Sequence, residues 1–361
     1  MKPFSPIYFI KENKAKCILL IFMLFLGYGA YLGGLYVSNP LTTFDLPLAY
    51  AEDHVRIALL SFDPEDRERL QNEASKIEDV QLIHLGTYQS FTWKSIMGFG
   101  SGDCSFTFRS VEDFKVFCEY MDIECDCDGL TSGSMVMSEK FAKNRGLKIG
   151  DKVDGEFSES LSDTFTLKAL TNEDGYAQYF ISDEDDRSTN FILIGKNGKG
   201  GRRLYDVAYG LKNDFNIFVH DNMRAEIEEQ FETFYVIYTF IVVLLSVILA
   251  VTINAAFVGM YQRRHFEFAV YRAIGISRRR MIGKIVGELL CMDLFALAGG
   301  GIVFFFGLYL FNELVLYPKG LYLRYFHPLA LFGLLLCNFA VIVPLMITRS
   351  RQMLKADICE Y

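Results

Sequence analysis

The stretch of sequence that decides the fold is TFYVIYTFIVVLLSVILAVTINAAFVGMY, which runs from Thr233 to Tyr261 without a charged residue. A membrane-spanning helix needs about 20 consecutive apolar residues, and this stretch is longer than that. A buried helix of a soluble protein rarely continues so far without a charge. The stretch therefore predicts a helix that crosses a lipid bilayer.

Three further stretches have the same apolar character and sufficient length. Residues 17–37 and 325–348 carry no charge, and residues 285–311 carry only Glu288 and Asp293. A cleaved signal peptide is the alternative for the first stretch, but its apolar region is too long and no small-residue cleavage site follows it. The sequence thus predicts four transmembrane helices, at residues 17–37, 233–261, 285–311 and 325–348.

Charge is divided unevenly between the apolar stretches. Residues 38–232 hold 37 acidic and 20 basic residues, whereas the rest of the chain holds 7 acidic and 16 basic residues. Short cytoplasmic flanks carry the excess of Lys and Arg, and such residues cluster in 1–16, 262–284 and 349–361. We therefore expect both termini and the loop 262–284 to be cytoplasmic, and the acidic domain 38–232 and the hairpin 312–324 to lie outside.

The expected location is the plasma (inner) membrane of a bacterium, which the absence of any Asn-x-Ser/Thr acceptor favours. Residues 1–16 mix lysines with aromatic residues, so they either lie along the inner membrane surface or form a disordered lead. Residues 221–231 are expected to form a helical stalk that leads into the second span.

The acidic domain is predicted to have an α+β fold. Ser110 and Ser138 each precede a predicted helix as its N-cap, and Gly146 supplies a left-handed C-cap. From Asp151 onward apolar residues alternate, which predicts a β-rich second half. The predicted strands are 56–60, 80–85, 105–108, 135–137, 165–169, 179–181, 191–194 and 215–219, and the predicted helices are 64–76, 110–121 and 138–146.

Four of the eight cysteines lie in this domain: Cys104, Cys118, Cys125 and Cys127. Four cysteines allow three pairings. The single residue between Cys125 and Cys127 makes a bond between those two difficult, and it does not fit the two-residue gap of zinc sites. Disulfides and unpaired thiols are therefore both expected ahead of a metal site.

Motifs for catalysis are missing from the sequence. The phosphate-binding pattern Gly-x-x-x-x-Gly-Lys-Ser/Thr does not occur, and the glycine-rich residues 195–201 lack its spacing. No serine nucleophile elbow and no His-Glu-x-x-His motif is present. We expect no enzymatic activity of this chain itself, no cofactor, no metal and no nucleic-acid partner.

Two motifs carry a resemblance to one family. The outer domain has VMSEKFA at 136–142 followed by GLKIGDKV at 146–153, and the cytoplasmic loop has EFAVYRAIG at 267–275, followed in the third span by Glu288 and Gly299-Gly300. In these motifs and in its topology the chain resembles the MacB/FtsX-like ABC permeases of the mechanotransmission type (type VII). Residues 155–220 resemble the family least.

The resemblance implies a permease without its own ATPase. An ATPase subunit, acting as a dimer, would bind ATP and Mg and move the outer domain. The implied function is export or extracytoplasmic handling of a peptide, lipid or lipoprotein, or defence against antimicrobial peptides. Further implied partners are a second permease copy or a paralogous permease, membrane lipids, and optionally an extracytoplasmic substrate-binding protein or lipoprotein.

Other function classes remain as alternatives. One is an ATPase-independent, membrane-anchored sensor or receptor, and another is a regulator of cell-wall hydrolases. A secondary transporter would have internal repeats and broken helices, and the sequence shows neither.

The cytoplasmic loop contains a predicted short amphipathic helix, at residues 264–274. On such a helix Glu267, Tyr271 and Ile274 share a face, and we expect aromatic residues of this helix to anchor the ATPase while its charges set the register. The alternative is that these side chains pack only against the membrane ends of the spans. The residues expected to couple the chain to the ATPase are Glu267, Phe268, Tyr271, Arg272 and Gly275.

Two other groups of residues stand out. The first motif is expected to be structural, through Ser138, Gly146, Gly150 and Asp151. Glu288 and Asp293 are the two acids within a span, where charge is costly. Glu288 lies one turn beyond Lys284 and is expected to reach the inner interface as a structural residue. For Asp293 we weigh a role in packing or coupling.

Overall fold

The structure is a computed structural model of the chain. It describes residues 27–39, 63–96, 98–100, 104–183, 189–195, 223–262 and 264–354, together with short pieces within 46–59 and 204–219. The predicted segment 1–16 and the first half of the predicted span 17–37 lie outside the described residues. Two compact units are formed, a helical unit of Met1–Ser38, Glu232–Phe311 and Leu323–Tyr361 and a sheet unit of Asn39–Phe231 and Asn312–Tyr322.

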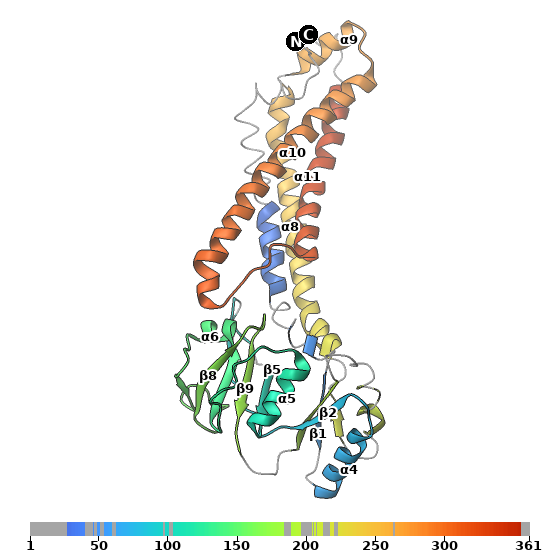
Figure 1. Ribbon diagram of the computed structural model, residues 1–361. Helices are drawn as coiled ribbons and strands as arrows, with labels where there is room; N and C mark the ends of the chain where they lie inside the picture. The colour runs from blue at the N-terminus through green and yellow to red at the C-terminus, as the bar shows by residue number, and fades with distance from the viewer. Residues whose placement is uncertain are drawn as a thin grey trace. The chain divides into compact units, whose positions relative to one another are not determined.

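Long apolar helices build the helical unit (Figure 1). α8 (Met223–Gln262), α10 (Arg278–Phe311) and α11 (Pro328–Leu354) are each long and apolar enough to cross a membrane, so three of the four predicted spans are found among the described residues. Residues 27–39 are also helical, and they include residues 27–37, the described part of the predicted first span.

Polar side chains between these helices find partners on neighbouring helices. The Tyr238 hydroxyl on α8 donates to the carbonyl of Ala30 at 3.0 Å. The same hydroxyl lies against Gly333 of α11, where a side chain would overlap it. Arg349 of α11 is 1% exposed and donates to the side-chain oxygen of Asn254 on α8 at 2.7 Å. Because an unpaired polar group is costly in lipid, such contacts fix how the helices pack.

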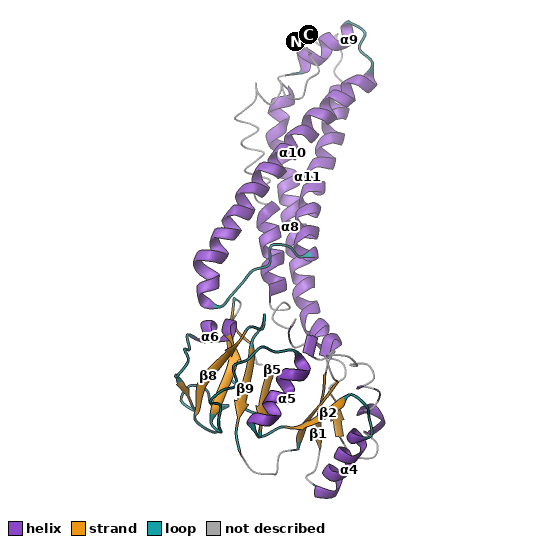
Figure 2. Cartoon of the chain, viewed as in Figure 1, coloured by secondary structure: helices purple, strands orange, loops and turns teal. Residues whose placement is uncertain are grey.

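The sheet unit contains two main sheets (Figure 2). The mixed sheet has the order β5-β9-β6-β8-β7, in which β5 and β9, and also β6 and β8, are parallel. The second sheet has the order β11-β1-β10-β2 and is antiparallel. The strand bounds are β1 His54–Leu59, β2 Val80–His84, β5 Cys104–Phe108, β6 Ser134–Ser138, β7 Lys152–Val153, β8 Phe165–Thr171, β9 Ala177–Ile181, β10 Asn190–Gly195 and β11 Ile217–Val219, with β3 Trp93–Ser95 and β4 Gly98–Gly100 as a separate ribbon.

The second half of the domain is rich in strands, as predicted, with β7 to β11 after Asp151, but these strands do not form a sheet of their own. β9 lies between β5 and β6, and β10 lies between β1 and β2. Every residue of β9 is buried, and such a strand needs partners on both edges and cover on both faces. The most apolar strands of the second half therefore take the central places among strands of the first.

The helices of the sheet unit begin where the sequence predicts. Asp63 accepts a hydrogen bond from Glu65 N at the start of α4 (Pro64–Ser75), and Ser110 accepts one from Asp113 N at the start of α5 (Val111–Met121). Each bond satisfies an amide that the helix itself leaves unpaired. The main core of the unit forms where α5 packs on the sheets, around Phe106, Phe108, Phe114, Phe117 and Tyr179.

Candidate functional site

A short separate helix, α9 (His265–Ala273), lies between α8 and α10 in the sequence. It ends because Gly275 adopts φ +83°, a left-handed conformation that favours glycine. The Ile276 amide then donates back to the Tyr271 carbonyl at 3.0 Å, and α10 begins at Arg278. The loop thus holds an ordered helix, as the sequence predicts.

Five side chains form a polar cluster on the inner side of α9: Arg264, Glu267, Tyr271, Lys284 and Glu288. Arg264 donates to Glu267 (Nε to Oε2, 2.8 Å) and to Glu288 (Nη1 to Oε2, 2.7 Å). The Lys284 ammonium lies 2.9 Å from Glu267 Oε1 and 3.0 Å from the Tyr271 hydroxyl, which itself donates to Glu267. The cluster therefore ties α9 to the first turns of α10.

The charges of the polar cluster balance one another. The Glu288 side chain is 1% exposed and that of Lys284 4% exposed, and buried charges are tolerated only when they are paired and hydrogen-bonded. Burial alone would raise the pKa of Glu267, but the hydrogen bonds from Arg264 and Lys284 lower it to about 2. Glu267 is therefore ionised at neutral pH.

Beside the polar cluster, α9 carries exposed apolar side chains. Phe266 and Val270, which are four residues apart on one face of the helix, are 69% and 42% exposed, and Ile274, the C-cap residue just after the helix, is 68% exposed. We call these three residues the outer stripe. Such a surface is suited to a groove on another protein, in which an amphipathic helix buries its apolar face.

Of the residues predicted to anchor the ATPase, Phe268 is fully buried in the core of the helical unit, together with Phe257 and Met281. Tyr271 packs partly against that core and bonds within the polar cluster. Both residues therefore pack against the ends of the spans, which is the alternative that the sequence left open. A helix this short buries its larger inner face on its own unit, because that removes more apolar surface from water.

Phe266 and Val270 are exposed on α9 but are not among the predicted coupling residues. The sequence signal for them is the apolar spacing of four in Phe266, Val270 and Ile274. Glu267 and Gly275 lie on or next to α9 as predicted, the first in the polar cluster and the second at the turn. Arg272 is half-buried in the last turn of the helix.

The motif of the sheet unit forms a compact structural element. Ser138 caps α6 (Glu139–Arg145), accepting from Phe141 N at 3.4 Å and donating to Gly175 O at 2.7 Å, and Gly146 ends the helix at φ +72°. Gly150 has φ +99°, and the Asp151 carboxylate accepts from Lys148 N at 2.8 Å, which closes the turn into β7.

The segment that joins α10 to α11 folds onto α6, through η2 (Asn312–Leu316) and η3 (Tyr317–Lys319). The Tyr176 hydroxyl donates to Gly320 O at 2.7 Å, and Asn144 donates to Lys319 O at 3.3 Å. Gly320 has φ +61°, and a Cβ there would overlap the Lys140 carbonyl oxygen. Only glycine fits this close approach of two backbones.

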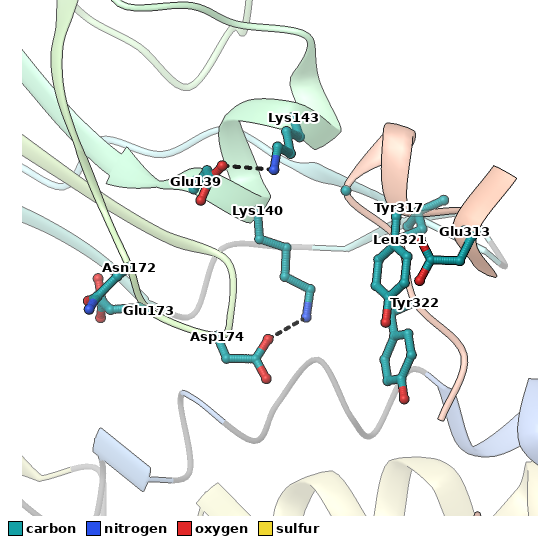
Figure 3. A pocket seen from close by; sticks show the side chains of 11 residues that line it. Glu139, Lys140, Lys143, Asn172, Glu173, Asp174, Glu313, Tyr317, Leu321 and Tyr322 are labelled. Carbon is teal, nitrogen blue, oxygen red and sulfur yellow. Dashed lines mark hydrogen bonds and ion pairs between the residues drawn. The ribbon is translucent and has the colours of Figure 1, made fainter. Parts of the chain in front are cut away.

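A cavity of about 710 Å³ lies between α6, the turn before β9 and this segment (Figure 3). Lys140 of α6 pairs with Asp174 of the turn before β9 at 3.1 Å, and Lys143 pairs with Glu139 within α6 at 2.8 Å. Burial raises the pKa of Glu173 to about 7, although the hydrogen bond from Tyr179 lowers it. The stacked rings of Tyr317 and Tyr322 stand on the other side. The remaining lining residues are Asn172, Glu313, Gly320 and Leu321.

The second intramembrane acid, Asp293, is 6% exposed and accepts a hydrogen bond from Asn338 of α11 at 3.4 Å. This contact connects α10 with α11. Within the described part of the chain, no group of three or more His, Cys, Asp or Glu side chains is arranged to hold a metal ion.

Comparison with known proteins gives one family match, in the C-terminal part of the chain. Residues 238–354 match the family FtsX-like permease C-terminal, and this range contains α9, α10, η2, η3 and α11 together with most of α8. The match confirms the resemblance predicted from the sequence over these residues. The search of curated proteins gave no match to the chain.

Proposed function

We propose that this chain, which has three helices long and apolar enough to cross a membrane and which matches the FtsX-like permease C-terminal family over residues 238–354, is the permease subunit of an ABC transporter whose ATPase is a separate polypeptide. The observation that carries the proposal is the two-sided α9. Its inner side is fixed to α10 by the polar cluster, while its outer stripe is exposed. The stripe is the surface that would enter a groove of the ATPase.

A movement of α9 would reach the sheet unit along two continuous routes. The first is α8, one unbroken helix of 40 residues, about 60 Å long at 1.5 Å per residue. The second is α10, which the polar cluster holds at one end and which leads at its other end into the segment packed on α6.

We further propose that α9 is cytoplasmic and that the sheet unit lies outside the plasma (inner) membrane of a bacterium. Charge asymmetry supports this orientation. The proposed function is export or extracytoplasmic handling of a peptide, lipid or lipoprotein, including defence against antimicrobial peptides. Exposed apolar side chains on α8 and α10, such as Phe240 and Ile302, would contact lipid and a second permease.

The test is copurification of the full chain from its native membranes in mild detergent, followed by mass spectrometry. We expect an ATPase with a phosphate-binding loop to accompany the wild type. Ile274→Glu should lose it, whereas Ile149→Glu, a change at an equally exposed apolar residue of the sheet unit, should retain it. Retention of the ATPase by Ile274→Glu, or a wild-type chain without any ATPase, would contradict the proposal and favour an ATPase-independent sensor.

A further inference from the structure

The cavity of the sheet unit is lined by α6, the turn before β9 and the segment 312–322, all of which belong to that unit. Its volume of about 710 Å³ lies within the range of small-molecule sites, roughly 300–1,000 Å³. Its walls are tied together, because Tyr176 and Asn144 donate to the carbonyls of Gly320 and Lys319. The cavity is therefore a preformed space that is large enough for a small ligand or for a side chain of a peptide.

Both lysines of the cavity already have carboxylate partners. The Lys140 ammonium lies 3.1 Å from a carboxylate oxygen of Asp174 and also over the ring of Tyr176, 5.4 Å from its centroid. The Lys143 ammonium lies 2.8 Å from Glu139, one turn earlier on α6. An anionic ligand would have to compete with a carboxylate for either lysine.

Two further carboxyl groups of the cavity have no cationic partner among the described residues. Glu173 accepts hydrogen bonds from two neutral groups, the hydroxyls of Thr171 and Tyr179, at 2.6 and 2.8 Å. Glu313 is exposed, and no described side chain forms an ion pair with it. The lining thus has two more carboxyl groups than ammonium groups, and this excess attracts a positive charge.

An aromatic surface stands beside one of these carboxyl groups. The rings of Tyr317 and Tyr322 are stacked, with centroids 5.4 Å apart and an interplanar angle of 8°. They share one wall of the cavity with Glu313 (Figure 3). The face of a tyrosine ring attracts ammonium and guanidinium groups, and it also offers apolar surface to the carbon chain that carries them. Carboxyl groups and ring faces together favour a cation on an apolar stem.

We propose that this cavity is a binding site for an organic cation, namely a primary ammonium or guanidinium group on an apolar stem. Glu313 and Glu173 supply the opposite charge, and the rings of Tyr317 and Tyr322 contact the stem. A free polyamine and a basic side chain of a peptide share this chemistry. The site has no residue in common with α9, so the inference goes beyond the proposed function and holds whether or not an ATPase binds there.

The test is isothermal titration calorimetry of the full chain, purified in a non-ionic detergent. Burial raises the pKa of Glu173 to about 7, so the titrations are made at pH 8, where this carboxyl group is mostly ionised. The probes are spermidine and a tri-lysine peptide with blocked ends, and a blocked tri-glutamate peptide is the anionic control. We expect the cationic probes to bind and the control not to bind, and the tighter cationic probe identifies the source as a free polyamine or a peptide. Binding of the anionic control alone, or of no probe, overturns the inference.

Matched variants separate binding in the cavity from attraction to the acidic surface of the domain. Glu313→Gln should weaken binding of the cationic probe about fivefold, the upper value for an ion pair near the surface. Glu159→Gln changes an exposed acid outside the cavity and should leave the affinity unchanged. Tyr317→Leu should weaken binding about two- to fivefold through loss of a ring face, whereas Tyr317→Phe should keep the wild-type affinity. If Glu313→Gln and Tyr317→Leu bind the cation as tightly as Glu159→Gln does, the cation does not occupy this cavity and the inference is wrong.

Discussion

Arg264, which precedes α9, and Glu288, in α10, form an ion pair with a distance of 2.7 Å between Nη1 and Oε2. The Glu288 side chain is 1% exposed and that of Arg264 is 14% exposed. A buried pair of this kind adds little net stability, but breaking it leaves a charge without its partner in a poorly solvated place. The pair therefore holds α9 at one position on α10.

Glu288→Gln should destabilise the chain through this pair. Arg264 would keep Glu267 as a partner, so we expect the free energy of unfolding to fall by about 3 kcal/mol, the lower end for a broken buried pair. Denaturation of the purified chain in detergent measures the change. Glu313→Gln removes an exposed carboxylate and should change stability by less than about 0.5 kcal/mol. Equal melting temperatures of wild type and Glu288→Gln would show that the pair is not formed.

The two phenylalanines of α9 should lose very different amounts of stability on truncation. Phe268→Ala leaves a cavity in the core of the helical unit and should cost about 3–5 kcal/mol of stability. Phe266→Ala shortens a side chain that is 69% exposed and should cost less than about 0.5 kcal/mol. Melting curves of both variants decide the matter, and a larger loss for Phe266→Ala would mean that α9 is rotated.

Gly320→Ala should loosen the segment 312–322 from α6. The substitution is strained at φ +61° and collides with the Lys140 carbonyl, which should cost at least about 1 kcal/mol. Trp93 is the only tryptophan of the chain, and it stacks at 4.7 Å on Tyr176, whose hydroxyl donates to Gly320 O. We expect a red shift of its fluorescence.

A matched glycine provides the control for this experiment. Gly307 lies in α10, where a Cβ would have open space, so Gly307→Ala should leave the emission of Trp93 unchanged. If both variants emit like the wild type, the segment does not depend on a glycine at 320.

The Glu173 carboxyl should make stability depend on pH. Its pKa in the folded chain, about 7, is above the ordinary value of 4.5, so the folded state holds a proton that the unfolded state releases. The stabilising contribution is complete below pH 4.5 and is lost as the pH rises through 7. Glu173→Gln should therefore be more stable than wild type by about 1–3 kcal/mol at pH 8. At pH 4.5 the difference should fall below about 0.5 kcal/mol.

Unfolding followed by Trp93 fluorescence at the two pH values measures this difference. Gln keeps an oxygen that accepts the hydrogen bonds from Thr171 and Tyr179, so the variant isolates the effect of charge. A Glu173→Gln variant that is less stable than wild type at pH 8 would show that the carboxylate is ionised and favourably held.

Local features were predictable from the sequence because they depend on near neighbours. The N-caps Ser110 and Ser138 and the C-cap Gly146 act on amides and carbonyls within a few residues. The long apolar stretches likewise predicted α8, α10 and α11. Each of these features needs only its own segment of sequence.

Features that depend on distant segments were not predictable in the same way. The central positions of β9 and β10 follow from competition among all strands for burial, and the docking of Gly320 on α6 joins residues far apart in the chain. The orientation of α9 depends on Lys284 and Glu288, which lie on another helix. A helical pattern alone could not decide whether Phe266 or Phe268 faces its own unit.

The most direct measurement of the central claim is photo-crosslinking from the outer stripe. The photoreactive residue p-benzoyl-phenylalanine is placed at Val270 or Ile274, and as a control at Ile302, an exposed apolar position of α10. After irradiation in native membranes, we predict adducts from 270 and 274, but not from 302, with a polypeptide that contains a phosphate-binding loop. If positions 270 and 274 give no such adduct while the chain is stably expressed, α9 does not couple this protein to an ATPase.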